Sequence, residues 1–239
     1  MTTGLLLVDK PLRLTSHDVV ARLRRLSGIR RVGHAGTLDP LATGVMLLCL
    51  GRAARLLEYL VGLPKSYRAV VRLGATTATY DAESDVVATR PFSHLTPADI
   101  EAALSQFKGD IQQQAPAYSA IKKDGQPLYK LARQGEAVEA PTRTVTIHRL
   151  QPVAIDLPEV VLDVDCSSGT YIRSLAHDLG QALGCGGYLA GLRRTAVAHF
   201  TLAEAVALDA LTADNWSTYL QPPDTAVAHL PRLDLPAAA

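Results

Sequence analysis

The sequence predicts an α+β fold built on a mixed, largely antiparallel sheet flanked by helices. Short apolar or alternating runs typical of strands, and amphipathic runs with helix-capping residues, follow one another without the regular strand–helix alternation of a doubly wound fold. The chain has 239 residues, of which 48% are hydrophobic and 20% are charged. It is therefore long enough for one large domain, or for one domain that carries an insertion.

The first third of the chain contains patterns for three strands and two helices. The apolar run GLLLV at 4–8 predicts a buried strand. The run TSHDVVARLRRLSG predicts a helix that Thr15 or Ser16 caps and that ends near Gly28. The other elements expected in this part are strands at 45–50 and 66–74 and a helix at 52–60.

The rest of the chain continues the mixture of helices and strands. The run TPADIEAALSQFKG at 96–109 predicts a helix with Thr96 as its cap and a proline in its first turn. The other elements expected here are strands at about 143–155 and 159–166, an amphipathic helix at 170–184 and a strand at 193–200.

No run of eighteen apolar residues occurs and the N-terminus has no signal-peptide pattern, so we expect a cytoplasmic protein with no membrane contact. The three cysteines, Cys49, Cys166 and Cys185, are odd in number and form no C-x-x-C pair. This pattern indicates reduced thiols, rather than a disulfide framework or a zinc site.

Charge is unevenly distributed along the chain, although the net charge is only +1. Residues 1–72 contain twelve Lys or Arg against four Asp or Glu, whereas residues 199–239 contain one against five. A basic N-terminal part suits a phosphate backbone, but an Arg-rich helix face is often simply solvated. Nucleic acid is therefore one candidate partner.

One short segment, GHAGTLDPLATG at 33–44, holds a single acidic residue, Asp39, among three glycines and a proline. The glycines permit backbone angles that are closed to other residues, and the proline stiffens the chain after Asp39. The segment is suited to holding one carboxylate in a fixed place. The alternative is an ordinary turn in which Asp39 caps backbone N–H groups.

Six blocks of the chain resemble, in order and approximate spacing, those of the TruB family of tRNA pseudouridine synthases. They are LLLVDKP, GHAGTLDPLATG, SYRAVVRLG, PAYSAIKKDGQPLYKLARQG, CSSGTYIRSLAHDLG and YLAGLRR, and they extend from about residue 4 to residue 200. The resemblance implies the pseudouridine-synthase fold with an inserted RNA-gripping element. It also implies isomerisation of the T-loop uridine at position 55 of tRNA to pseudouridine.

Pseudouridine formation breaks the N1–C1′ bond of a uridine and rejoins the uracil through C5, so the base must first leave its stack. One carboxylate suffices for this chemistry, and the resemblance implies that Asp39 is that group. It acts either as a nucleophile at C1′ or as a base that removes the C2′ proton, and the sequence does not choose between these routes. We expect neither a metal ion nor a cofactor, because the departing uracil is a stable anion that stays bound.

The same resemblance implies roles for four residues around the target base. Arg173 matches an arginine that pairs with the catalytic aspartate, where a guanidinium keeps a buried carboxylate ionised and oriented. Tyr67 matches a tyrosine that stacks on the base and is a candidate for the proton at C5. Leu192 matches a residue that closes the apolar side of the pocket, and Tyr171 lies in the motif of Arg173. Without the resemblance, Tyr67 and Leu192 would be interpreted as core residues and Arg173 as part of an ordinary ion pair.

Two further residues have open alternatives. His34 matches a histidine that fills the space left by the flipped nucleotide, whereas a lone histidine in a loop is more often a hydrogen-bonded turn residue. Lys10 matches a lysine near the active site, where it contacts phosphate or supports the Asp39 loop. In either case Pro11 restricts Lys10 to extended geometry.

We expect a catalytic domain at 1–220, with an insertion at about 111–142, followed by a tail rich in Pro and Ala at 221–239. The insertion is polar, rich in Gln, Gly and Lys, and weakly periodic. The tail is too short for the PUA domain that bacterial members of the family usually carry, so we expect no such domain.

The expected partner is the T arm of tRNA, and we expect the protein to act as a monomer. Two other functions stay open. A non-catalytic RNA-binding protein with this fold would not need Asp39, Tyr67 and Arg173, all of which are present. A hydrolase of N-glycosidic bonds would hold a water molecule and usually a second carboxylate, whereas Asp39 is the one acid in its motif.

Overall fold

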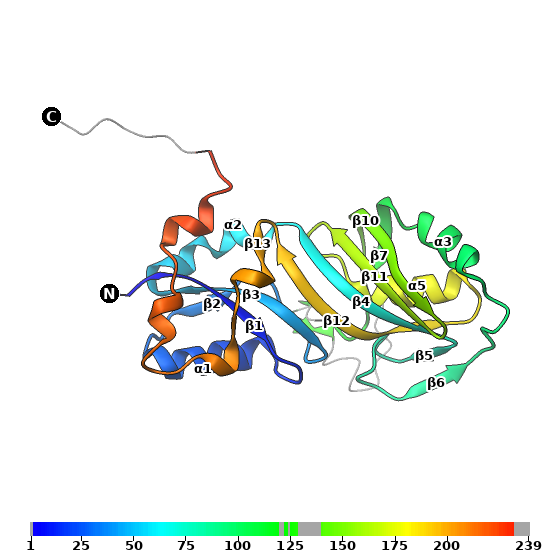
Figure 1. The fold of residues 1–239 in the computed structure, drawn as a ribbon, viewed down its shortest axis with the longest axis horizontal. Coiled ribbons are helices and arrows are strands. Elements are labelled where there is room, and N and C mark those ends of the chain that lie inside the picture. Colours follow the sequence, from blue (N-terminus) through cyan, green and yellow to red (C-terminus); the bar gives the residue numbers. More distant parts are fainter. Residues whose placement is uncertain (1, 120–121, 124, 129–139, 232–239) are drawn as a thin grey trace. The chain divides into compact units, whose positions relative to one another are not determined.

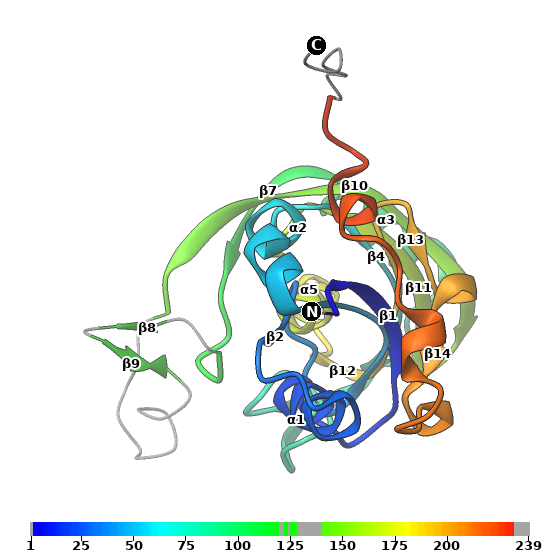
Figure 2. The ribbon, with the colours of Figure 1, turned by 90° about the vertical axis from the view of Figure 1, so that its left-hand side faces the viewer.

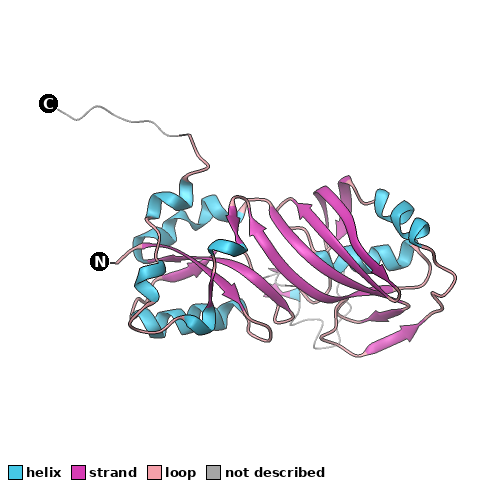
Figure 3. Cartoon of the chain, in the orientation of Figure 1, coloured by secondary structure: helices cyan, strands magenta, loops and turns pink. Residues whose placement is uncertain are grey.

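The computed structural model describes residues 2–119, 122–123, 125–128 and 140–231 (Figure 1). The chain divides into two compact units: Met1–Leu63 with Ala196–Ala239 form the first, and Pro64–Thr195 form the second. Each unit combines strands with helices (Figure 3), so the predicted α+β class is confirmed.

Two long antiparallel strands form the centre of the first unit. Strand β1, Gly4–Lys10, pairs along its whole length with β3, Ala42–Leu50. Residues 45–50 are all buried, because this continuous apolar run presents no polar face to solvent. The strand predicted at 45–50 therefore begins three residues earlier. Three short strands complete the pairing in this unit: β2 (Val32–His34) on β3, β14 (Val206–Ala207) on β1, and β13 (Phe200–Thr201) on Ala196 and Val197.

Helix α1, Ser16–Ser27, follows the predicted capping pattern. The hydroxyl of Thr15 accepts a hydrogen bond from the backbone N–H of Asp18, and the Asp18 carboxylate accepts one from the backbone N–H of Thr15. These bonds from Thr15, of which the side-chain bond counts most, lower the pKa of Asp18. The helix ends at Gly28, whose φ of 69° lies in the left-handed region that glycine adopts easily.

The helix predicted at 52–60 is in fact two elements. A 3₁₀-helix spans Gly51–Leu56, and helix α2 follows at Leu57–Val61. Three residues per turn bring side chains at i and i+3 of a 3₁₀-helix onto the same side. Arg52 and Arg55 therefore share one exposed face of this segment.

The described part of the C-terminal segment packs on the first unit. The backbone of Gln221 accepts a hydrogen bond from Leu5 at 3.0 Å and donates one back at 2.8 Å. Farther along, a 3₁₀-helix at Pro223–Val227 places Ala226 in the same apolar cluster as Leu5 and Leu7. The last eight residues of the predicted tail lie outside the described residues.

The second unit is built on antiparallel strands in the order β12-β4-β11-β10-β7. Side chains alternate along β4, with odd-numbered residues buried and Arg68 and Arg72 exposed, so one face of the sheet is packed and the other is solvated. Figure 1 shows β4, β11 and β10 side by side. Their bounds are Gly187–Val197 (β12), Lys65–Leu73 (β4), Glu159–Cys166 (β11), Thr142–Asp156 (β10) and Gly109–Gln114 (β7).

Two segments of this sheet differ from the sequence-based expectation. Residues 111–114, expected at the start of a surface insertion, belong to β7, where they pair with residues 142–145 of β10. Their Gln-rich composition hid the strand, because β-propensity depends mostly on packing against neighbours. The strand expected at 193–200 begins at Gly187 and ends at Val197.

Close packing of helix α5, Ile172–Ala182, explains why β12 begins with glycines. A Cβ atom on Gly180 would lie 2.0 Å from the backbone nitrogen of Gly187, so the helix and the start of the strand meet at their backbones. Only glycine permits this approach. These glycines therefore allow α5 to pack directly on the start of β12.

The remaining elements among the described residues of the second unit are one helix and two small hairpins. Helix α3, Pro97–Ser105, has the predicted Thr96 cap with Asp99 as its reciprocal partner. The strands β5 (Ala75–Thr77) and β6 (Val86–Thr89) form one hairpin, and β8 (Lys122–Lys123) and β9 (Gln126–Pro127) form the other. Figure 2 shows the second hairpin projecting away from β7 and β10. Most of the predicted insertion beyond it, residues 129–139, lies outside the described residues.

Within the described residues, no helix is long and apolar enough to cross a membrane. The three cysteines are buried free thiols. Burial raises the pKa of Cys49 to about 12 and that of Cys166 to about 11.

One carboxylate on α5 makes the stability of the second unit depend on pH. Burial raises the pKa of Asp178 to about 6 from a usual value of 3.8. The folded protein therefore binds this proton more tightly than the unfolded chain, and the charged carboxylate costs stability as the pH rises from 3.8 to 6. Above pH 6 the whole cost is present.

We predict that Asp178→Asn increases the free energy of unfolding at pH 7.5 by about 1–2 kcal/mol, a value reduced for the partial exposure of the carboxylate. The gain should shrink toward zero as the pH falls below 4, because both side chains are then neutral. Urea unfolding of the two proteins across this pH range measures it. Asp214→Asn, which changes an exposed aspartate, is the control. An equal gain at pH 4 and pH 7.5 would contradict the assignment.

Candidate active site

Asp39 lies in the loop that joins β2 to β3, and the side chain is half-buried. The backbone holds both sides of this loop. Before Asp39, the N–H of Ala35 donates to the carbonyl of Leu47 at 3.0 Å, and after it the N–H of Ala42 donates to the carbonyl of Asp39 itself, also at 3.0 Å. Gly36 has a φ of 106°, which an L side chain rarely adopts, so the sharp turn before Asp39 depends on a glycine.

A buried serine at the start of α1 holds the residue directly before Asp39. The hydroxyl of Ser16 donates to the carbonyl of Leu38 at 3.0 Å and accepts from the N–H of Leu38 at 2.8 Å. One side chain thus satisfies both backbone groups of Leu38, which is itself buried. The predicted function of the segment, to fix a carboxylate in place, has a physical basis in these contacts.

Lys10 is fully buried at the end of β1. Its ammonium donates to the carbonyls of Pro11 and Leu14, which lie in the turn that leads into α1. The N–H of Arg13 in the same turn donates to the carbonyl of Pro40 at 2.8 Å, next to Asp39. Of the two alternatives left open by the sequence, this geometry favours support of the loop, and a phosphate contact stays untested.

His34 is the last residue of β2 and pairs with Leu48 across the hairpin. Its side chain is half-buried. The strand pairing places it five residues before Asp39, at the start of the Asp39 loop. The role of filling the space left by a flipped base stays a prediction.

Tyr67 and Leu192 lie on neighbouring strands of the second unit. Tyr67 points to the packed face of β4, opposite Val164 of β11. A Cβ atom on Gly191 would lie 3.6 Å from the side chain of Val70, and one on Gly187 would lie 3.3 Å from that of Leu73. The two strands therefore run antiparallel. Val70 lies on the solvated side of β4, so Gly191 shares that side, and Leu192, the next residue, lies on the packed side with Tyr67 and the buried Arg194.

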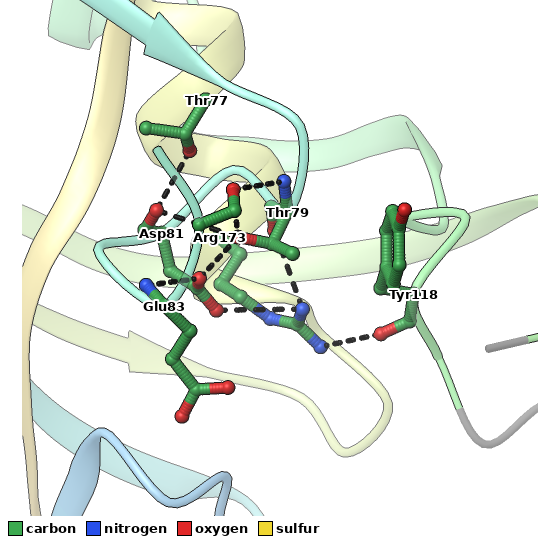
Figure 4. A network of polar contacts seen from close by, with 7 residues as sticks. Thr77, Thr79, Asp81, Glu83, Tyr118 and Arg173 are labelled. Carbon is green, nitrogen blue, oxygen red and sulfur yellow. Dashed lines mark hydrogen bonds and ion pairs between the residues drawn. The ribbon is translucent and has the colours of Figure 1, made fainter. Parts of the chain in front are cut away.

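Arg173 is buried in the first turn of α5, within a network of polar contacts (Figure 4). Its guanidinium lies 3.5 Å from the carboxylate of Asp81 and donates to the carbonyls of Thr79 and Tyr118 at 3.3 and 3.1 Å. Asp81 is buried as well, and its carboxylate accepts hydrogen bonds from the Thr79 hydroxyl and from the N–H of Glu83. The loop at 77–83 thus fixes the direction of the arginine.

Tyr171, directly before α5, is held through its backbone. The amide of Gln113, which is fully buried in β7, accepts from the N–H of Tyr171 at 2.8 Å and donates to its carbonyl at 3.0 Å. The Ser174 hydroxyl donates to the carbonyl of Gln114 at 2.8 Å, so three hydrogen bonds tie the start of α5 to β7. Tyr171 packs against the buried cluster of Ala115, Leu128 and Ala140, and the guanidinium of Arg143 lies 5.5 Å from the centre of its ring.

The structure brings the predicted site residues together in two sets. The first set belongs to the first unit and consists of Asp39 in its loop, His34 at the end of β2 and Lys10 at the end of β1. The second set belongs to the second unit and consists of Tyr67, Tyr171, Arg173 and Leu192. The predicted pairing of Asp39 with Arg173 joins the two units and stays a prediction. Within the described residues, no group of three or more His, Cys, Asp or Glu side chains could hold a metal ion.

Sequence reasoning missed three polar residues that contact the predicted ones: Asp81, Gln113 and Arg194. Asp81 lies in the acidic run YDAESD and Gln113 in a run of three glutamines, where nothing distinguishes a buried side chain from exposed neighbours. Arg194 offered a signal, because it lies two residues after Leu192 and so shares its face in a strand.

Solved structures with the same fold include protein–RNA assemblies. A crystal structure of a Cbf5-Nop10-Gar1 complex matches 95% of this chain with a TM-score of 0.75 and 29% identity. A structure of an H/ACA RNP bound to a substrate RNA containing 2′-deoxyuridine matches with a TM-score of 0.73 and 27% identity. This chain spans 62% of the length of each of those two chains.

Sequence relatives and family models agree on one class. The model described as TruB family pseudouridylate synthase (N terminal domain) matches residues 24–172, and that of the tRNA pseudouridylate synthase B C-terminal domain matches residues 173–228. Proteins named tRNA pseudouridine synthase B are 48% identical in Ralstonia pickettii and 50% identical in Mycobacteroides abscessus. Both matches cover 98% of this chain, and 76% and 80% of those proteins.

Fold and sequence together define an isomerase that converts uridine in RNA to pseudouridine. The chain belongs to the TruB family of pseudouridylate synthases.

We predict that Gln113→Leu lowers the free energy of unfolding by about 1–3 kcal/mol, because it leaves the N–H of Tyr171 without its partner. Gln112→Leu is the matched control: Gln112 is exposed on the same strand and donates to the Thr144 hydroxyl. This control should cost less than about 1 kcal/mol. Denaturant unfolding of both variants measures the difference, and equal costs would contradict a special role of Gln113.

Proposed function

We propose that this chain isomerises the T-loop uridine at position 55 of tRNA, with Asp39 as the carboxylate that carries out the bond chemistry. The observation that supports this most is the anchoring of Asp39. A loop with backbone contacts on both sides and a buried serine at Leu38 places one acid, half-exposed, in the motif shared with the family. An aspartate that served only as a turn cap would not require this support.

The reaction is a rearrangement in which the N1–C1′ bond breaks, a C1′–C5 bond forms and the proton at C5 leaves. The uracil carries a negative charge while it is detached from the sugar. Asp39 attacks C1′ or removes the C2′ proton, and both routes need the same ionised carboxylate near the sugar. The target base must be out of its stack for either.

The second unit supplies the groups that hold the base. Tyr67 stacks on the uracil, Leu192 lies on the same strand face and limits its other side, and Tyr171 lines the site beside Arg173. The Arg173 guanidinium pairs with Asp39, and Asp81 keeps it pointing in one direction when RNA is absent. His34 fills the space of the flipped base, and Lys10 supports the loop through the carbonyls of Pro11 and Leu14.

We place the phosphate-binding surface on the first unit. Arg30, Arg31, Arg52 and Arg55 are exposed there, and they make no ion pair with any residue that the structure describes. The carbonyl of Arg31 accepts a hydrogen bond from the N–H of Gly51, the residue before Arg52. Arg31 and Arg52 are therefore close to each other along the backbone. By contrast, arginines on the solvated sheet face of the second unit are paired with acids: Arg68 with Asp163, Arg72 with Glu159 and Arg149 with Asp165.

The proposed partner is the T arm of tRNA, and the proposed working form is a monomer in the cytoplasm. The T arm suits this chain because its loop nucleotides can be splayed out and read by shape, as is common in RNA recognition.

We predict that Asp39→Asn abolishes pseudouridine formation and changes RNA affinity by less than about threefold, which is below 1 kcal/mol. The assay uses an unmodified tRNA transcript labelled with tritium at C5 of uridine, because the reaction releases that hydrogen. Asp18→Asn, in the same unit, is the control and should keep full activity, since Asp18 is exposed and the asparagine carbonyl can still accept the hydrogen bond from the backbone N–H of Thr15. Pseudouridine formation by Asp39→Asn would refute the assignment, and release of free uracil by the unchanged protein would instead indicate a hydrolase.

We also predict that the affinity for tRNA falls with salt, with a slope near 0.7–0.9 in log affinity per log salt for each phosphate contact. Replacing Arg31, Arg52 and Arg55 by Gln should reduce this slope by about 2. The same change at Arg68, Arg72 and Arg149 should leave it unaltered, because those arginines are already neutralised by acids. Filter binding between 50 and 300 mM salt, about the range where such slopes are measured, tests both variants. Equal slopes for them would place the RNA elsewhere.

A further inference from the structure

Arg194 is the largest fully buried side chain that the structure describes, with 1% of its surface exposed. Its guanidinium and the phenol of Tyr67 share a hydrogen bond. Burial lowers the pKa of Arg194, and the contact with Tyr67 opposes that change. An arginine stays charged at every accessible pH, so a positive charge is fixed against the oxygen of Tyr67.

The arrangement of the strands explains the contact. β12 and β4 are neighbours in the sheet, and the contacts of Gly187 with Leu73 and of Gly191 with Val70 indicate that they run antiparallel, so the part of β12 that follows Gly191, with Arg194, lies beside the part of β4 that holds Tyr67. Both side chains occupy the packed face of the sheet, together with Leu192. The three residues therefore follow one another on the surface against which the target base is proposed to stack.

A second cation lies on the same face. Lys65 is two residues before Tyr67 in β4 and is 6% exposed. Burial, and to a smaller extent the charge of Arg194, lower the pKa of Lys65 to about 8. Two buried cations, Lys65 and Arg194, therefore accompany Tyr67 on the packed face of the sheet.

We propose that Arg194 is a positioning residue for the isomerisation, which orients the phenol of Tyr67 and keeps a positive charge beside the detached uracil. The inference rests on the proposed stacking of the base on Tyr67. A guanidinium that donates to a neutral oxygen makes a strong, directed hydrogen bond. In a site closed to water, a fixed charge stabilises an anion without any reorganisation when the anion forms.

Packing alone does not account for an arginine here. Removing a cation from water costs several kcal/mol, and an apolar residue of the same volume is often at least as stable. Leucine or methionine would fill the space between β4 and β12 without this cost. What the arginine adds is a charge and a donor aimed at one atom.

The test compares Arg194→Met, Arg194→Lys and the unchanged protein under single-turnover conditions on a tRNA transcript. We expect Arg194→Met to lower the rate by about 10- to 100-fold, less than the loss of a donor that touches the reacting atoms. Arg194→Lys should recover part of the rate, and RNA affinity should change by less than about threefold for both. Arg68→Met is the matched control, because Arg68 lies on the opposite face of β4, and its rate should be unchanged.

A second background shows whether Arg194 acts through Tyr67. In Tyr67→Phe, which lacks the phenol oxygen, Arg194→Met should cause less than about a threefold further loss, because coupled residues are not additive. A second measurement does not depend on turnover. Arg194→Met should change the ultraviolet absorption spectrum of the tyrosines, and the same substitution should leave that spectrum unchanged in the Tyr67→Phe protein. Arg194→Lys alone gives the answer if Arg194→Met does not fold.

Each failure has its own signature. If the unchanged protein forms no pseudouridine, the proposed function is wrong and the position of Arg194 is irrelevant. If the unchanged protein is active and both Arg194→Lys and Arg194→Met are as active as it is, the positioning role is wrong. Independent losses in the Tyr67→Phe background, or a loss of RNA affinity equal to the loss of rate, would also overturn it.

Discussion

The burial of positive charge is the constraint on which most of the site depends. Among the described residues, four cations are less than one-tenth exposed: Lys10, Lys65, Arg173 and Arg194. A buried cation is tolerated only where polar atoms surround it. Carbonyls at Pro11 and Leu14 meet this need at Lys10, and Asp81 with two carbonyls meets it at Arg173. The turn before α1 and the loop at 77–83 are therefore shaped by the charges that they accommodate.

Backbone groups near the site are satisfied in a similar way, by buried side chains that each bond two atoms. Ser16 holds the N–H and the carbonyl of Leu38, and Gln113 does the same for Tyr171. Leu38 comes directly before Asp39, and Tyr171 comes two residues before Arg173. Such contacts fix the backbone directly, and each one leaves little freedom for the side chain that follows. The rigidity of this region comes from polar contacts with the backbone more than from apolar packing.

Local sequence signals predicted the parts of the fold that local physics decides. The helices that start at Ser16 and Pro97 carry complete capping boxes, and the strands at 4–10 and 65–73 have unmistakable apolar patterns. The start of β12 and the strand β7 were missed because tertiary contacts decide them: a glycine contact with α5 and pairing with β10. The roles of Asp81, Gln113 and Arg194 follow from burial, which polar residue types do not announce. Asp39, Tyr67 and Arg173 were found through the family motif rather than through any local rule.

The two faces of the sheet in the second unit hold similar residues under different physical conditions. On the solvated face, Arg68 and Asp163 form a surface ion pair, which contributes little to stability because water and salt screen it. Either residue can change with little effect on the other. On the packed face, Arg194 has no access to water, so a change at Tyr67 alters the surroundings of a charge that cannot leave. Substitutions there must be coupled, and the identity of one residue restricts the choice at its neighbour. The inner face of β4 and β12 therefore behaves as one chemical unit, whereas the outer face is a set of independent pairs.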